Sequence, residues 1–219
     1  MSISEQPGGV RVVASRSAAA ALVLDLGLLT LLAAFMLLLA TPTFGLRRLH
    51  IGAQSGTFSD QLTYVAVART FADTLHLRPH ILLSSALWRR SSITEHMIYQ
   101  PGYFAVLGAS YRAFGFGVWQ SLLPSLLGYL IGGLGAYLLA ARAAGRGAGW
   151  LAALLFLGCP PVLLFTGSAM SDLTTAGAGT LALLIFLWLP ERARPAAGVL
   201  LLCSVYLLRE TMALLAAPM

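Results

Sequence analysis

Long apolar runs separated by short polar segments dominate the chain. Five runs approach the roughly 20 residues that cross about 30 Å of hydrocarbon as a helix: residues 18–40, 118–141, 149–167, 173–189 and 196–217. The first run is longer than the apolar core of a cleavable signal peptide, which is about 7 to 15 residues, so we read it as an uncleaved signal anchor. The pattern predicts an all-α, polytopic membrane helix bundle with about five transmembrane helices.

The segment between the first two runs, residues 41–117, contains an amphipathic pattern that is too polar to cross a bilayer. From Asp60, apolar residues recur at the spacing of one helical face: Tyr64, Val67, Ala68, Phe71, Ala72 and Leu75. Ser59 or Asp60 can cap the start of this helix, and Pro79 closes the segment. Arg69 and Asp73 lie four residues apart on the other face and could form an ion pair.

A second stretch in the same segment, "PGYFAVLGASYRAFG", runs from Pro101 to Gly115. It is short for a span, and Arg112 interrupts it. We therefore expect a helix that lies flat on the membrane surface. Within the later runs, the spacing of Gly128 and Gly132 fits close helix packing, and Cys159-Pro160-Pro161 predicts a kink in the third span.

Composition supports a membrane protein. The 219 residues are 58% hydrophobic and only 10% charged, against about 25% charged in an ordinary soluble domain. The formal net charge is +6, and all 14 basic residues are arginine. In a soluble protein this charge would suggest nucleic acid, but here membrane topology explains it better, so we expect no nucleic-acid partner.

The arginines of the short connections predict orientation. They come in three pairs: Arg11 and Arg16, Arg142 and Arg146, Arg192 and Arg194. An alternating path places all three pairs on one side, which the positive-inside rule makes cytoplasmic. We therefore expect a cytoplasmic tail at 1–17, a transmembrane domain at 18–217 in the cell membrane, and an outer loop at 41–117.

Only a few ionisable residues accompany the apolar runs. Asp172 opens the fourth run after the short turn "SAMSD", and Arg209 and Glu210 lie inside the fifth. Ionisable groups within a membrane are costly and are by default functional. For Arg209, the alternative is an ion pair with Glu210 or Asp172 that only aids packing. Asp25, in the first run, we interpret as structural. The histidine and acidic residues of the outer loop match no metal-site spacing, so we predict no metal site.

Several motifs then occur in a familiar order. The amphipathic helix opens with Ser59-Asp60-Gln61-Leu62-Thr63-Tyr64, and the second helix opens with Gln100-Pro101-Gly102-Tyr103 and ends with Phe114-Gly115. Met170-Ser171-Asp172 follows the third run, and "YLLRET", residues 206–211, supplies a late basic residue. In order and spacing, the chain resembles the GT-C membrane glycosyltransferases, especially the protein O-mannosyltransferase and aminoarabinose-transferase branch.

The resemblance implies a function and a set of site residues. It implies transfer of a sugar from a polyprenyl-phosphate donor to a protein, lipid or glycan acceptor at the outer face. Asp60 and Asp172 would be catalytic and would face each other across one outer cavity. Gln61, Tyr64, Gln100, Tyr103 and Arg209 would bind substrate. From residue chemistry alone, Asp60 and Asp172 could each be a helix cap instead.

Two departures from the family pattern affect the expected chemistry. Gln61 stands where the family often has Glu, and Gln100 stands where the aminoarabinose transferases have Lys, a cation that would hold the donor phosphate. Family members are also longer, so we expect a fragment, a split gene or a reduced relative that works with a C-terminal half or partner subunit. The alternative functions are a transporter or permease subunit and a non-catalytic membrane assembly factor.

Overall fold

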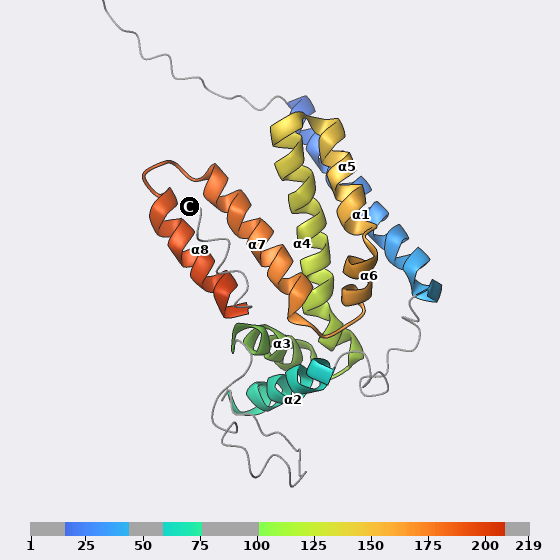
Figure 1. Ribbon diagram of the computed structural model, residues 1–219, viewed down its shortest axis with the longest axis vertical. Helices are drawn as coiled ribbons and strands as arrows, with labels where there is room; N and C mark the ends of the chain where they lie inside the picture. Colours follow the sequence, from blue (N-terminus) through green and yellow to red (C-terminus); the bar gives the residue numbers. More distant parts are fainter. Residues whose placement is uncertain (1–15, 44–58, 76–100, 209–219) are drawn as a thin grey trace, which may run out of the picture.

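The computed structural model describes residues 16–43, 59–75 and 101–208, and these residues form helices without any strand. The helices are α1 (Arg16–Thr43), α2 (Ser59–Thr74), α3 (Pro101–Phe114), α4 (Val118–Ala144), α5 (Arg146–Leu157), α6 (Pro160–Thr166), α7 (Ser171–Trp188) and α8 (Arg194–Leu208). Figure 1 shows α1, α4, α5, α7 and α8 as one bundle, with α2 and α3 lying across one end. The predicted all-α fold is therefore confirmed.

The described residues contain three helices long and apolar enough to cross a membrane, namely α1, α4 and α7. The pair α5 and α6 meets the same criteria if it is taken as one bent span, which makes up to four. Helix α8 is apolar but shorter in its described part. The fifth predicted span, 196–217, extends beyond the described residues, so the structure supports a multi-span membrane protein without establishing five spans.

The third predicted span is broken, as its Pro-Pro sequence predicts. Helices α5 and α6 are bent by 59° at Gly158 and Cys159. Pro161 has no N–H to donate to the carbonyl of Leu157, four residues earlier. The hydroxyl of Tyr129, from α4, donates to that carbonyl at 2.9 Å. The break is thus stabilised by a neighbouring helix, which satisfies the carbonyl that proline leaves free.

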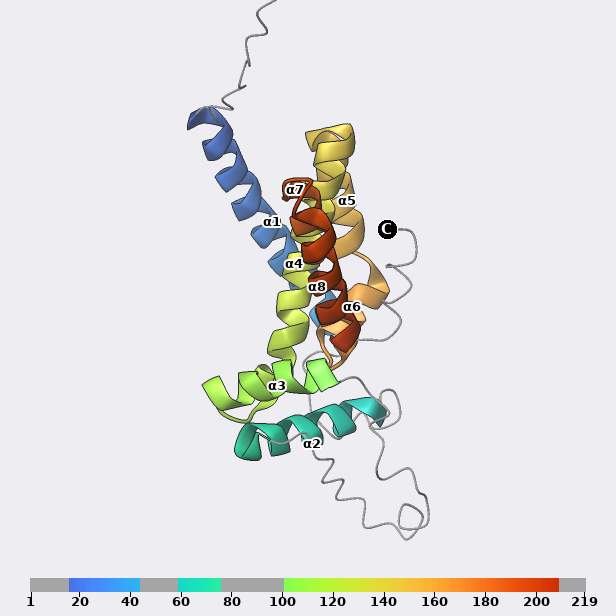
Figure 2. The same cartoon turned by 90° about the vertical axis from the view of Figure 1, so that its left-hand side faces the viewer.

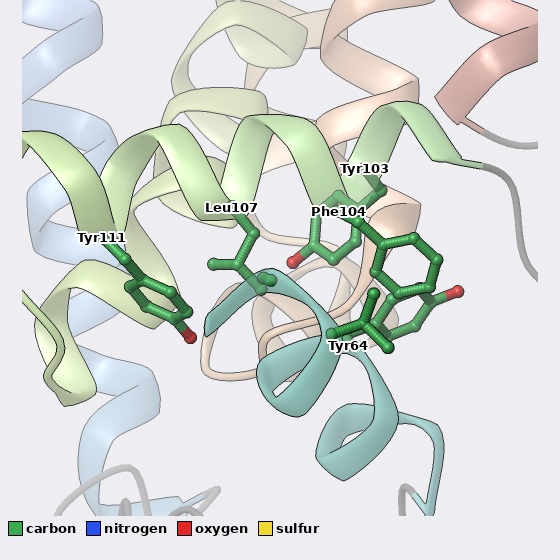
Figure 3. Close-up of a cluster of buried hydrophobic side chains, with 7 residues drawn as sticks. Tyr64, Tyr103, Phe104, Leu107 and Tyr111 are labelled. Atoms are coloured by element: carbon green, nitrogen blue, oxygen red, sulfur yellow. The ribbon is translucent and has the colours of Figure 1, made fainter. Parts of the chain in front are cut away.

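The two predicted surface helices are also present. Helix α2 contains the periodic stretch that begins near Asp60, and α3 begins at Pro101. Their apolar faces pack together in a buried cluster, shown in Figure 3: Tyr64, Val67, Ala68, Tyr103, Phe104, Leu107 and Tyr111. Figure 2 shows both helices running across the bundle end rather than along the bundle axis, as expected for surface helices.

One expectation about α2 is wrong. Arg69 and Asp73 form no ion pair in the described part of the chain. The Arg69 guanidinium instead lies over the ring of Phe116, 4.8 Å from the ring centroid. The face of an aromatic ring can compete with an exposed carboxylate for a guanidinium, since an exposed ion pair contributes little in water.

The closest helix contact in the bundle joins α4 and α7. A Cβ added to Gly128 would come within 2.1 Å of the carbonyl oxygen of Leu173, and one added to Gly177 would come within 2.7 Å of the Gly128 Cα. About two turns further along α4, a Cβ at Gly135 would meet the Thr180 side chain. Only glycine permits this approach of two backbones, which is how small residues drive helix association in membranes.

The Gly128 and Gly132 pair does not act as one packing motif. Gly128 faces α7, whereas a Cβ at Gly132 would meet the ring of Phe156 on α5, at 2.5 Å. The two glycines therefore let α4 approach two different helices. The prediction of close packing is confirmed at each glycine. The two glycines do not, however, face the same helix, as glycines at this spacing usually do.

Asp25 connects three helices at the opposite end of the bundle from α2 and α3. Its carboxylate accepts hydrogen bonds from Arg146, whose Nε lies 2.9 Å away, and from the hydroxyl of Tyr137. Asp25 is 3% exposed, so without these partners a buried charge would remain unpaired. The structural role that we assigned to Asp25 agrees with these contacts between α1, α4 and α5.

The α4–α7 contact leads to a stability prediction. We expect Gly128→Ala to lower the free energy of unfolding by about 1–3 kcal/mol, because the added methyl collides with backbone that cannot rotate away. Gly27 is the matched control, since a Cβ there meets nothing within 4 Å. Gly27→Ala should leave stability unchanged or raise it by up to about 1 kcal/mol. Denaturant unfolding in detergent measures both, and equal effects would contradict the contact.

Candidate functional site

The predicted site residues that the structure describes gather where α2, α3, α4 and the turn before α7 meet. We call this region the helix junction and define it by Tyr64, Tyr103, Ser125, residues 168–170 and Ser171. Figure 1 places it at the end of the bundle away from the α4–α5 and α7–α8 connections. The short arginine connections and the junction therefore lie at opposite ends, as the alternating path requires.

Ser125 fixes the turn that leads into α7. Its hydroxyl lies 2.7 Å from the Ser168 carbonyl oxygen and 3.2 Å from that of Met170, and it donates to this pair of acceptors. Ser125 is completely buried within α4. These contacts fix the position of the turn relative to α4. They therefore also fix the position of the first residues of α7.

Tyr64 connects α2 to the start of α7. Its hydroxyl lies 3.4 Å from the Ser171 hydroxyl, the long end of hydrogen-bonding distance. Its ring meets the Tyr103 ring edge-on, with centroids 4.8 Å apart. In Figure 3 the Tyr64 and Tyr103 side chains come from two different helices and approach each other. The contact between Tyr64 and Ser171 joins two residues that are 107 positions apart in the chain.

Two further hydroxyls attach α3 to α4. Ser121 donates to the Gly117 carbonyl, so the Tyr111 hydroxyl, 2.7 Å away, donates to Ser121. Ser110 donates at 2.8 Å to the carbonyl of Gln120, which has no helical donor because Pro124 lacks an N–H. Burial raises the pKa of Tyr111 to about 12, and the Ser121 hydrogen bond offsets part of the shift. Tyr111 therefore stays a neutral donor near neutral pH.

Tyr103 is the most buried aromatic residue of the junction. It is 0% exposed, and its hydroxyl has no partner at hydrogen-bonding geometry in the described part of the protein. Burial raises its pKa far above the ordinary range, with the neighbouring Ser125 hydroxyl acting in the opposite direction. The phenol is therefore a neutral buried donor with unused hydrogen-bonding capacity, which costs about 1–3 kcal/mol unless another group meets it.

The two predicted catalytic positions lie in the first turns of the helices that Tyr64 and Ser171 connect. Asp172 is partly exposed and follows Ser171 directly in the first turn of α7. Asp60 lies in the first turn of α2, four residues before Tyr64 and thus on the same helical face. The Asp60 side chain lies outside the described residues, so the expectation that it faces Asp172 stays a prediction.

The other predicted site residues are only partly described. Gln61 belongs to α2, but its side chain lies outside the described residues, as do Gln100 and Arg209 in full. Tyr64 and Tyr103 are buried in the contact between α2 and α3. In the ranges that the structure describes, no three histidine, cysteine or acidic side chains come together to hold a metal.

Several residues in and beside the junction had no sequence signal of their own. Ser125, in the junction, and Tyr111, on α3, each make a hydrogen bond of 2.7 Å, yet neither belongs to a motif. Ser121 and Ser125 do lie four apart on one face of an apolar helix, where hydroxyls need partners. That spacing indicates a polar face on α4, but it does not identify α3 and the turn before α7 as the partners.

Comparisons with protein-family models, with curated proteins and with solved structures give no match. The class of protein therefore follows from the fold alone, which is an all-helical membrane protein with helices lying across one end of its bundle. Any more specific function rests on the geometry of the helix junction.

The Ser125 contact leads to a prediction about the junction. Ser125→Ala removes the donor that two turn carbonyls share, and we expect the free energy of unfolding to fall by about 1–3 kcal/mol. Ser204→Ala is the control, because Ser204 donates only within its own helix, to Leu200, from an exposed position. That control should change stability by less than about 0.5 kcal/mol. Equal losses would mean that Ser125 does not fix the turn.

Proposed function

We propose that the protein is a GT-C-type glycosyltransferase, or a part of one, that transfers a sugar from a polyprenyl phosphate at the outer face of the cell membrane. The observation that supports this proposal is the contact between Tyr64 and Ser171. It connects the helices whose first turns carry Asp60 and Asp172, at one end of a membrane bundle. In this proposal α8 continues into a fifth span, and the helix junction faces outward.

The placement of the junction suits a lipid-linked donor. The lipid tail of such a donor stays in the bilayer, while its phosphate and sugar lie at the surface where α2 and α3 cross the bundle. An acceptor hydroxyl attacks the anomeric carbon, and the phosphate leaves with the electrons of the broken bond. We assign Asp60 to orient the acceptor hydroxyl and take its proton, a role that a positioned carboxylate can perform. Asp172 is the second acidic group of the site.

The remaining predicted residues divide into two groups. Tyr64 and Tyr103 are buried, so we infer that they act by positioning α2 against α7. Substrate contact then falls to Gln61, Gln100 and Arg209, with the arginine meeting the donor phosphate by a charge-assisted hydrogen bond. Gln100 cannot supply the cation found in the aminoarabinose transferases, which leaves Arg209 as the phosphate partner that we propose.

The break between α5 and α6 gives some support to a transporter. Broken helices line the midplane sites of many transporters. Here, however, the carbonyl at the break is satisfied by Tyr129, and apolar residues such as Met36 and Leu163 pack around it. The break therefore favours a packed structural kink, and the enzyme remains the better supported function.

The proposed orientation can be tested by cysteine labelling. In a variant without Cys159 and Cys203, we expect Ser55→Cys to react with a membrane-impermeant maleimide on intact cells. Gly145→Cys, in the α4–α5 connection, should react only after the membrane is permeabilised. Labelling of position 145 from outside would contradict the orientation.

The proposed chemistry can be tested by neutralising Asp60. Asn caps a helix about as well as Asp, so Asp60→Asn should fold and insert normally. It removes the group that takes the proton, and transfer of radiolabelled sugar from a polyprenyl-phosphate donor should fall by about 10²- to 10⁴-fold. The assay uses membranes that contain the full-length protein or its complementing half.

A matched control lies on the same helix. Asp73 is exposed near the end of α2, so Asp73→Asn makes the same chemical change away from the junction. Its transfer rate should stay close to wild type. Wild-type turnover by Asp60→Asn would show that Asp60 serves only as a helix cap. The non-catalytic assembly factor would then be the better supported function.

A further inference from the structure

The chain turns sharply between the surface helix α3 and the span α4. We call residues 112–120 the elbow. Gly115 has a φ of +83°, a conformation that residues with a side chain rarely adopt, and it ends α3. Helix α4 is apolar and long enough to cross a membrane and begins at Val118. The elbow therefore lies where a span leaves the bilayer, at the depth of lipid headgroups.

The elbow exposes three large aromatic side chains. Phe114 is 64% exposed, Phe116 is 52% exposed and Trp119 is 71% exposed. In water such exposure would cost free energy, but aromatic rings are favoured at the membrane interface, where they lie between acyl chains and headgroups. The exposure of all three rings within residues 114–119, where α4 begins, indicates contact with lipid.

Two arginines accompany these rings. Arg112 is exposed in the last turn of α3. Arg69 reaches the elbow from α2, where its guanidinium rests on the Phe116 ring. Phe116 is itself held by an edge-on contact with Tyr111, with centroids 5.1 Å apart. One guanidinium is thus held against one of the exposed rings, which reduces the entropy lost when it binds an anion.

The elbow carries positive charge without an acidic residue of its own. Residues 112–120 contain Arg112 and no Asp or Glu. The neighbouring acidic side chain is Asp73, one turn beyond Arg69 on α2, and it pairs with neither arginine within the described ranges. Both guanidinium groups therefore keep free donors, and guanidinium binds phosphate oxygens with several N–H groups at once.

We propose that the elbow is a binding surface for the phosphate headgroups of anionic bilayer phospholipids. The aromatic rings set its depth at the interface, and Arg69 and Arg112 select negative over neutral headgroups. This surface is separate from the helix junction, so the proposal does not depend on glycosyl transfer. A soluble anion would lack the acyl chains that the exposed rings contact, which is why a lipid fits better than free phosphate.

Lipid binding to the purified full chain tests the proposal. Native mass spectrometry from neutral detergent would compare added phosphatidylglycerol with phosphatidylcholine. Wild type should retain the anionic lipid preferentially, and Arg69→Gln with Arg112→Gln should lose that preference. Each arginine near a charged membrane surface contributes about 1 kcal/mol, so we expect about a fivefold loss in affinity for each substitution.

A control with the same change in charge lies at the other end of the bundle. Arg142 and Arg192 are exposed in the short connections, and replacing both with Gln should leave the preference at the elbow in place. An equal loss in this control, or an unchanged preference in the elbow variant, would overturn the proposal. So would displacement of the lipid by millimolar inorganic phosphate, which would indicate a simple anion site.

Two further variants keep the test decisive. If the double variant fails to fold, Arg112→Gln alone should still show about a fivefold loss. Trp119→Ala keeps both charges and removes an interfacial anchor, so it should weaken binding of both lipids alike. Loss of the anionic preference alone in Trp119→Ala would contradict the separate roles that we give to rings and arginines.

Discussion

The close approach of α4 and α7 is the constraint on which the rest of the structure depends. Gly128 and Gly177 bring two backbones into contact, with no room for a side chain at either position. In a membrane, helices gain little from hiding apolar surface, so this packing has to come from shape and from hydrogen bonds. Because α7 starts against α4, the turn before it comes within reach of Ser125.

The polar contacts of the bundle concentrate at its two ends. At one end, Asp25, Arg146 and Tyr137 join α1, α4 and α5. At the other, hydroxyl groups attach α3 and the start of α7 to α4. Between them the helices pack mainly through apolar residues and glycine. This division suits a protein whose centre meets hydrocarbon and whose chemistry, as we propose it, takes place at one surface.

The sequence predicts the elements better than their contacts. The periodicity from Asp60 and the start at Pro101 anticipate α2 and α3 within a residue or two, because a strong apolar stripe and a proline are local signals. The kink at Pro160 is equally local. The Tyr129 hydrogen bond at the α5–α6 break, the stacking of Arg69 on Phe116 and the partners of Ser125 depend on residues distant in the chain. Of the candidate site, Tyr64 and Asp172 are brought to one region, a result that no local pattern could provide.

The most direct test of the account is the position of the Asp60 and Asp172 carboxylates in an experimental structure of the protein in a lipid environment. The account predicts that both open onto one cavity beside the Tyr64–Ser171 contact, within roughly 10 Å of each other, a separation that an attacking group and a sugar can fill. Carboxylates on opposite sides of the bundle would contradict it. In that case each carboxylate would only cap the N-terminus of its own helix.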